Sequence, residues 1–79
     1  MDVLDLANSS TDKENFSNFL KALEHDFINN KDEWENWSVD SYLKAICAWI
    51  NDYREDDVNF ETPDWKTIAA MFYAGKIYE

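Results

Sequence analysis

The chain has 79 residues, with 17 acidic and 7 basic side chains, and a formal net charge of −10 at pH 7. An acidic surface repels nucleic acids and anionic membranes, whereas it accelerates encounters with basic proteins. One cysteine excludes an internal disulfide, and together with one histidine it cannot complete a structural zinc site. We therefore expect no cofactor, no nucleic-acid partner and no membrane partner.

The N-terminal MDVLDL carries acids where a signal peptide needs positive charge, and no apolar run is long enough for a membrane span. These features predict a cytoplasmic protein. Glycine and proline occur once each, which leaves no room for a glycine-rich phosphate loop or a sheet with many turns.

The first predicted helix covers residues 12–29. Thr11 and Glu14 have the spacing of a capping box at its start. Apolar residues then recur every three or four positions, as on one face of a helix. These residues are Phe16, Phe19, Leu20, Leu23 and Phe27.

The second predicted helix covers residues 39–54. Ser38 is a favourable N-cap, and Trp37 and Tyr42 are spaced as a hydrophobic staple across the first turn, which predicts that Trp37 belongs to the core. The apolar face that follows is wide, as expected of a central helix with two neighbours.

The third predicted helix covers residues 63–78. Thr62 is its expected N-cap, Pro63 stands at the first helical position, and Asp64 lies near the positive end of the helix dipole. Gly75 either weakens the last turn or permits close packing. Short connections favour antiparallel neighbours, so we predict one all-α domain, residues 1–79. Its architecture would be a three-helix up-down-up bundle with a short N-terminal arm, Val3 to Leu6.

Two acidic clusters carry most of the excess charge. The first comprises Asp32, Glu33 and Glu35, and the second comprises Asp52, Glu55, Asp56 and Asp57. They either keep an apolar bundle soluble, or dock a basic partner, or imitate a DNA backbone. The last interpretation is disfavoured, because an up-down-up bundle would place the clusters at opposite ends.

Two candidate contact surfaces accompany these clusters. Trp34 has acidic neighbours on both sides in the sequence. It either caps the open end of the bundle or serves as a contact residue for a protein partner. The outward face and margins of the third helix carry no charge, which makes homodimerisation a second hypothesis. That face comprises Thr67, Ala70, Tyr73, Ala74, Ile77 and Tyr78.

Catalytic groups are sparse. His25 falls opposite the apolar stripe with no nucleophile placed beside it, and Cys47 is expected to pack as a small apolar group. The acidic stretch from Asp52 to Glu61 lacks the central glycine and the spacing of an EF-hand. We therefore do not expect an enzyme.

Several stretches between Glu14 and Glu79 form a recognisable pattern. They are Trp34-Glu35-Asn36, Tyr42-Leu43 with Ala45, Ala48-Trp49-Ile50 with Asp52, Pro63-Asp64-Trp65 with Ala69, and the ending Ala74-Gly75-Lys76-Ile77-Tyr78-Glu79. The pattern resembles a family of small acidic bacterial proteins of unknown function. Gly75 departs from it, because alanine precedes the lysine in that family. The resemblance implies a single small domain of bacterial or phage origin, and it supplies no catalytic residue.

In size and charge the chain also resembles small acidic helical immunity proteins. The leading hypothesis is a protein-binding inhibitor, an immunity protein that neutralises a basic toxin or nuclease. A phage-encoded inhibitor of a host defence protein fits the same features. The alternative from another class is a self-associating structural or regulatory adaptor.

Overall fold

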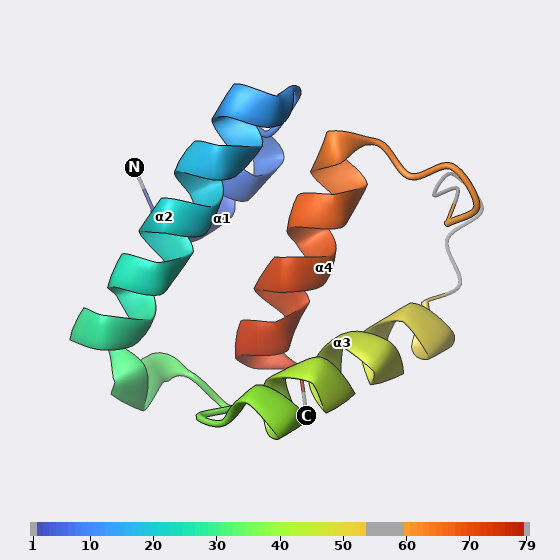
Figure 1. Ribbon diagram of the computed structural model, residues 1–79. Helices are drawn as coiled ribbons and strands as arrows, with labels where there is room; N and C mark the ends of the chain where they lie inside the picture. Colours follow the sequence, from blue (N-terminus) through green and yellow to red (C-terminus); the bar gives the residue numbers. More distant parts are fainter. Residues whose placement is uncertain (1, 54–59, 79) are drawn as a thin grey trace.

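The computed structural model describes residues 2–53 and 60–78, and within them the chain is helical with no strand. In chain order the helices are α1 (Val3–Asn8), α2 (Lys13–Asn29), the 3-10 helix η1 (Lys31–Glu33), α3 (Val39–Asp52) and α4 (Trp65–Ile77). The predicted all-α class is confirmed. Among the described residues there are four α-helices instead of three, and their arrangement also differs from the expected one (Figure 1).

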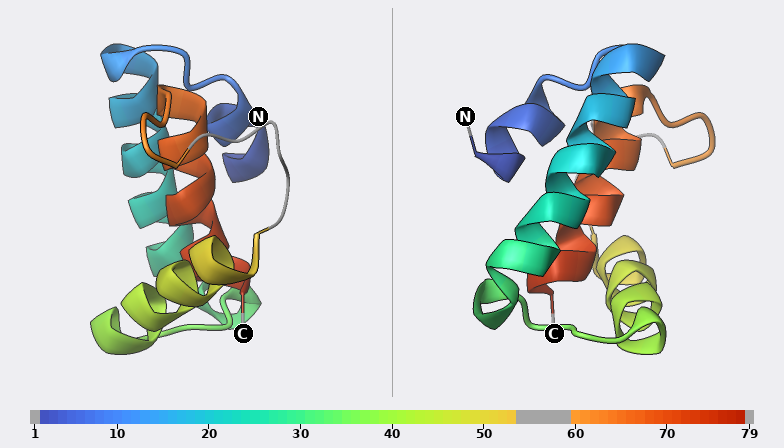
Figure 2. Two further views of the ribbon diagram at one scale, coloured as in Figure 1. Left: turned by 90° about the vertical axis from the view of Figure 1, so that its right-hand side faces the viewer. Right: turned by 60° about the vertical axis from the view of Figure 1, so that its left-hand side comes forward.

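The arrangement is built around α2 and α4, which lie side by side and run in the same direction (Figure 1). The helix α3 does not lie antiparallel between them. It crosses beside the C-terminal end of α4, as both views in Figure 2 show. One side of α2 is therefore left without a helical neighbour along part of its length.

Aspartates cap three of the four described α-helices, and in α1 the cap is Asp2, whose Oδ1 accepts a hydrogen bond of 2.9 Å from the backbone N–H of Asp5. Asp12 Oδ1 accepts a hydrogen bond of 2.8 Å from the backbone N–H of Asn15, and Asp64 Oδ1 accepts one of 2.8 Å from that of Thr67. The predicted caps Thr11 and Thr62 were therefore wrong, because each precedes an ionised carboxylate that also complements the helix dipole. The hydrogen bonds from Thr67 lower the pKa of Asp64.

The N-cap of α3 is the one expected. Ser38 accepts from the backbone N–H of Ser41, and the Ser41 hydroxyl lies 3.3 Å from the backbone nitrogen of Ser38, which completes a reciprocal capping box. Because each serine side chain accepts from the backbone N–H of the other, this pair fixes the residue at which α3 begins.

The segment predicted as an arm is the helix α1. It packs against both α2 and α4, with Ala7 buried and Val3 and Leu6 partly buried against the core. Ser10, also buried, donates its hydroxyl to the Leu6 carbonyl at 2.9 Å. The helix therefore forms part of the fold.

The core is formed by small side chains where helices approach and by rings between them. Its buried members are Ala7, Phe19, Leu23, Trp34 and Ala69. Phe16 adds ring contacts to α4, with centroid distances of 5.4 Å to Trp65 and 5.8 Å to Phe72. Such tilted aromatic pairs add to the stabilisation that burial alone provides.

Candidate functional site

The connection between α2 and α3 is held by one largely buried carboxylate. Asp26 Oδ2 accepts a 2.8 Å hydrogen bond from the indole N–H of Trp34 and lies 2.9 Å from Nζ of Lys76. Asp26 Oδ1 accepts from the side-chain amide of Asn30 at 3.0 Å. One carboxylate therefore joins α2, the connection and α4.

Two opposing effects act on this carboxylate. Burial by itself raises the pKa of Asp26, but the hydrogen bonds from Lys76, Trp34 and Asn30 outweigh it, so the pKa lies below its usual value. Asp26 is therefore ionised at neutral pH, which is the state that a partly buried lysine needs as its partner.

Trp34 belongs to the core. Its side chain is 7% exposed, with the Phe27 ring edge-on at 5.0 Å and the Tyr42 ring stacked at 6.0 Å. Trp34 therefore closes the open end of the helices, as one of the two interpretations expected, and its role as an anchor for a partner stays a prediction.

Asn36 and Glu35 fix the connection to the end of α4. The Asn36 side-chain amide donates to the carbonyls of Gly75 at 3.0 Å and of Tyr78 at 2.9 Å. The backbone N–H of Glu35 donates to the Lys76 carbonyl at 2.9 Å. These bonds set the point from which α3 departs, and so the space between α3 and α2.

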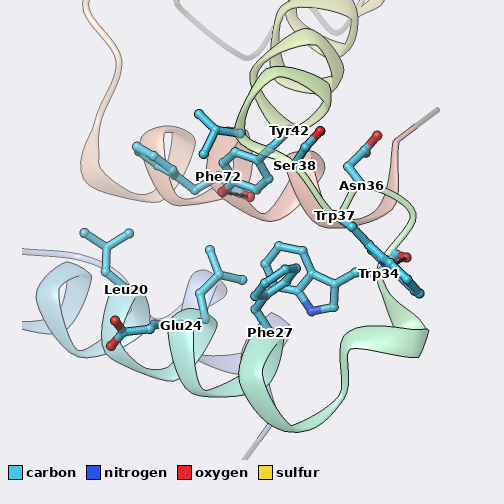
Figure 3. A pocket seen from close by; sticks show the side chains of 11 residues that line it. Leu20, Glu24, Phe27, Trp34, Asn36, Trp37, Ser38, Tyr42 and Phe72 are labelled. Carbon is cyan, nitrogen blue, oxygen red and sulfur yellow. Dashed lines mark hydrogen bonds between the residues drawn. The ribbon is translucent and has the colours of Figure 1, made fainter.

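That space is an apolar groove of about 360 Å³, which we call the α2–α3 groove (Figure 3). Leu20, Glu24 and Phe27 line it from α2, facing Tyr42 of α3 and Phe72 of α4. Its other lining residues are Leu23, Trp34, Asn36, Trp37, Ser38 and Val39. Glu24 is the one charged residue among these described lining residues.

Large apolar side chains at the groove are exposed to water. The exposed fraction is 61% for Trp37, 76% for Val39 and 37% for Leu20. The prediction that Trp37 belongs to the core was therefore wrong. Its indole N–H donates to the Trp34 carbonyl at 2.8 Å, which holds the ring at the groove while most of its surface stays uncovered. Exposed apolar side chains gathered around a concave surface are typical of a protein-binding or ligand-binding site.

The first acidic cluster surrounds the same connection. Asp32, Glu33 and Glu35 are exposed. In the second cluster Asp52 is exposed and accepts a hydrogen bond from the Tyr78 hydroxyl, whereas Glu55, Asp56 and Asp57 lie outside the described residues. Glu35 and Asp52 both contact the C-terminal end of α4, so the described members of the clusters do not lie at opposite ends of that helix.

The face of α4 expected to self-associate is partly covered. Ala74 is 3% exposed, Thr67, Ala70, Tyr73 and Tyr78 are half-buried, and Ile77 stays exposed. A hollow of about 240 Å³ separates most of this face from Leu4 and Ala7 of α1 and from Trp49 of α3. Because α1 occupies this side of α4, the face is smaller than the sequence indicated. Self-association stays a prediction.

The remaining candidate residues lie apart from the groove. His25 is exposed, with its Nε2 3.1 Å from Nδ2 of Asn29. Cys47 is exposed as well, so the expectation that it packs as a small apolar group was wrong. Over the described ranges, no three His, Cys, Asp or Glu side chains come close enough to hold a metal ion. No helix in those ranges is long and apolar enough to cross a membrane.

Sequence reasoning missed the residues that shape the groove, above all Asp26, Lys76 and Val39. Asp26 follows Leu23 by three positions and Leu23 follows Phe19 by four, which is the spacing of the buried stripe itself. An acid in register with an apolar stripe is a signal for a buried, partnered carboxylate. No comparable signal distinguishes Val39 from any other residue at a helix start.

A protein-family model described as a family of unknown function (DUF7660) matches residues 12–79. The match includes the whole groove and leaves out α1. A search of curated proteins and a search of solved structures each found no match.

Proposed function

The chain belongs to this family of unknown function, and we propose that it is a protein-binding domain that holds a segment of a basic partner in the α2–α3 groove. The observation that carries the proposal is the exposure of Trp37 and Val39 beside a concave apolar surface. Leaving large apolar side chains in water forgoes about 1.5–3 kcal/mol for each one that could be buried. A bound partner recovers that free energy.

The charge of the chain indicates the chemistry of the partner. A net charge of −10 on 79 residues favours encounter with basic proteins, and the exposed acids of the first cluster lie on the connection that borders the groove. Electrostatic attraction of this kind raises the association rate and weakens with salt. The groove then supplies the short-range contacts that hold the partner.

Inhibition is the outcome we propose for binding. The partner would be a basic toxin or nuclease whose active surface is covered, as an immunity protein covers its toxin. The small size and the acidic surface support this proposal, since a nuclease recognises phosphates with lysine and arginine. A phage-encoded inhibitor of a host defence protein would use the same surface.

A matched pair of variants tests the groove. The tagged protein is used to capture partners from the lysate of its source organism at low and at high salt, followed by mass spectrometry. Val39→Arg fills the groove, whereas Ile28→Arg places the same side chain on another exposed site, because Ile28 is 68% exposed and does not line the groove. We expect the wild type and Ile28→Arg to retain the same basic protein, and Val39→Arg to lose it.

Two outcomes would contradict the proposal. Equal capture by the two variants would place the contact elsewhere on the surface. A wild-type dimer in analytical ultracentrifugation that only Val39→Arg dissociates would show that a second copy of the chain covers the groove.

A further inference from the structure

The α2–α3 groove has no unused side-chain donor. The indole N–H groups of Trp34 and Trp37 donate to Asp26 and to the Trp34 carbonyl. The Tyr42 hydroxyl donates to the Phe72 carbonyl at 2.6 Å, and Ser38 donates to the Ser41 hydroxyl at 2.9 Å. The Asn36 amide donates twice, to the carbonyls of Gly75 and Tyr78. A bound segment therefore receives no hydrogen bond from these side chains.

This property limits the conformation of the bound segment. An extended peptide would bury carbonyl groups against apolar walls without a side-chain donor, and each such buried group destabilises the complex. Strand addition needs an exposed strand edge, and residues 2–53 and 60–78 contain no strand. A helix pairs its backbone N–H and carbonyl groups with one another, so it can enter an apolar groove without leaving those groups buried and unpaired.

The apolar residues that line the groove also have the spacing expected for contacts with a bound helix. Leu20, Leu23 and Phe27 line the groove at positions i, i+3 and i+7 of α2, and Val39 and Tyr42 line it from α3. A helix lying between two helices presents its own apolar side chains with the same spacing, which is the usual form of helix-in-groove recognition.

One charged group interrupts the apolar lining. The Glu24 carboxylate makes no hydrogen bond or ion pair to any other side chain within the part of the chain that the structure describes. As an ionised acceptor beside an apolar surface it favours a cationic donor on the occupant. No lysine or arginine lines the groove to compete for it.

Resting on the proposed function, we infer that the occupant of the groove is an amphipathic α-helix of the partner, with apolar residues at i, i+3 or i+4 and i+7, and with a lysine or arginine opposite Glu24. The apolar face packs between Leu20 and Val39. The cation sets the orientation and register of the helix along the groove.

Two displayed peptide libraries test this inference. Both contain random peptides of about 14 residues, four helical turns. The second library has a fixed central proline, which breaks helices and leaves the other positions random. Each library is selected on the wild-type protein, and every binder is then measured on Val39→Arg and on Ile28→Arg. We expect binders from the first library alone, with apolar residues in the helical spacing and affinity at least tenfold lower on Val39→Arg.

A charge exchange tests the role of Glu24. Glu24→Lys should weaken the selected peptides about tenfold, and replacing the peptide lysine or arginine with glutamate should restore affinity for this variant alone. An exchange that restores nothing would overturn the assignment of the cation. Because Glu24 is exposed on α2, the variant is expected to fold.

The possible failures are distinguishable. Val39-dependent binders that carry the central proline would overturn the helix while leaving the groove as a binding site. Binders insensitive to Val39→Arg, or none from either library, would overturn the helical occupant. Capture of a basic protein from the lysate would then still decide the proposed function.

Discussion

The indole N–H of Trp34 donates to the carboxylate of Asp26 at 2.8 Å, and this bond joins the connection between two helices to the C-terminal half of α2. The same carboxylate oxygen faces Lys76 of α4, so three segments of the chain depend on one charged group. The groove opens directly beside this contact, since Trp34 is one of its walls. Stability and the shape of the proposed binding site are therefore coupled through Asp26.

Replacing Asp26 with asparagine tests this coupling. The amide leaves Lys76 without its anionic partner and retains much of the shape, and breaking one side of a buried ion pair costs about 3–5 kcal/mol. Since both side chains keep roughly a tenth of their surface in water, we expect about 3 kcal/mol, measured by urea unfolding. In a double-mutant cycle, Lys76→Met should cost far less in the Asp26→Asn background than in the wild type. Additive losses would show that the two side chains do not interact.

Gly75 permits the close approach of α3 to α4. A Cβ atom at this position would stand 2.7 Å from two ring atoms of Tyr42, far inside van der Waals contact. Gly75→Ala should therefore destabilise the fold by about 1–2 kcal/mol, because overpacking outweighs a gain of about 1 kcal/mol in helix propensity. In a Tyr42→Leu background the ring is absent and the same substitution should stabilise. A stabilising effect in the wild type would mean that Tyr42 moves aside at little cost.

Tyr42 predicts how stability depends on alkaline pH. Burial raises the pKa of its hydroxyl to about 12, whereas an unfolded chain releases this proton near the ordinary value of 10.0. The folded state then holds a proton that the unfolded state has lost, so the free energy of unfolding is unchanged below pH 10 and falls as the pH rises toward 12. Urea unfolding at about pH 9 and at about pH 11 measures the fall.

Two tyrosine-to-phenylalanine variants show which tyrosine causes the loss of stability at alkaline pH. Tyr42→Phe loses the hydrogen bond to the Phe72 carbonyl, so it should be less stable at neutral pH and show a smaller alkaline loss. The pKa of Tyr78 is also raised, chiefly by its hydrogen bond to Asp52, and Tyr78→Phe isolates that contribution. An alkaline loss undiminished in Tyr42→Phe would assign the effect to other groups.

Local patterns predicted the helices well where their signals lie close together in sequence. The Ser38 cap and the stripe of Phe19 and Leu23 each depend on neighbours about one turn away. The shifted caps at Asp12 and Asp64 show the limit of this reasoning, because a Thr and an Asp one or two positions apart offer two possible caps, and the aspartate is the one used in both cases.

The features that create the groove depend on contacts between distant residues. Trp34, for which the sequence left two positions open, is buried with its indole N–H bonded to Asp26, whereas Trp37, expected in the core, is exposed. Nothing adjacent to either ring in the sequence indicates that bond. The crossing of α3 depends on Gly75 meeting Tyr42, two residues that are unrelated in periodicity. The helix α1 has six residues, too few to show periodicity or to be stable without the core.

The helix α1 lies outside the family match, yet it should contribute to stability. Leu6 packs against the core, whereas Leu4 is 45% exposed, and both stand in the same short helix. We expect Leu6→Ala to cost about 1–2 kcal/mol of unfolding free energy and Leu4→Ala less than about 0.5 kcal/mol. Thermal denaturation of the two variants measures the difference. Equal small losses would show that α1 is dispensable for the fold.

Trp37 should report directly on occupation of the groove. Its indole is mostly in water, so covering it with the apolar face of a partner helix moves the ring into an apolar environment and shifts its fluorescence to shorter wavelength. Trp37→Ala should weaken binding by about 2 kcal/mol, as a central aromatic contact does, without lowering the midpoint of thermal unfolding.

Trp65→Phe provides the matched control for this measurement. Trp65 is 38% exposed but packs on Phe16, away from the groove, so its replacement should leave the blue shift intact. Trp37→Phe should remove the shift while retaining most of the affinity, because a ring still covers the site. A shift that persists in Trp37→Phe and disappears in Trp65→Phe would move the binding surface to the opposite end of α4, beside its N-terminus.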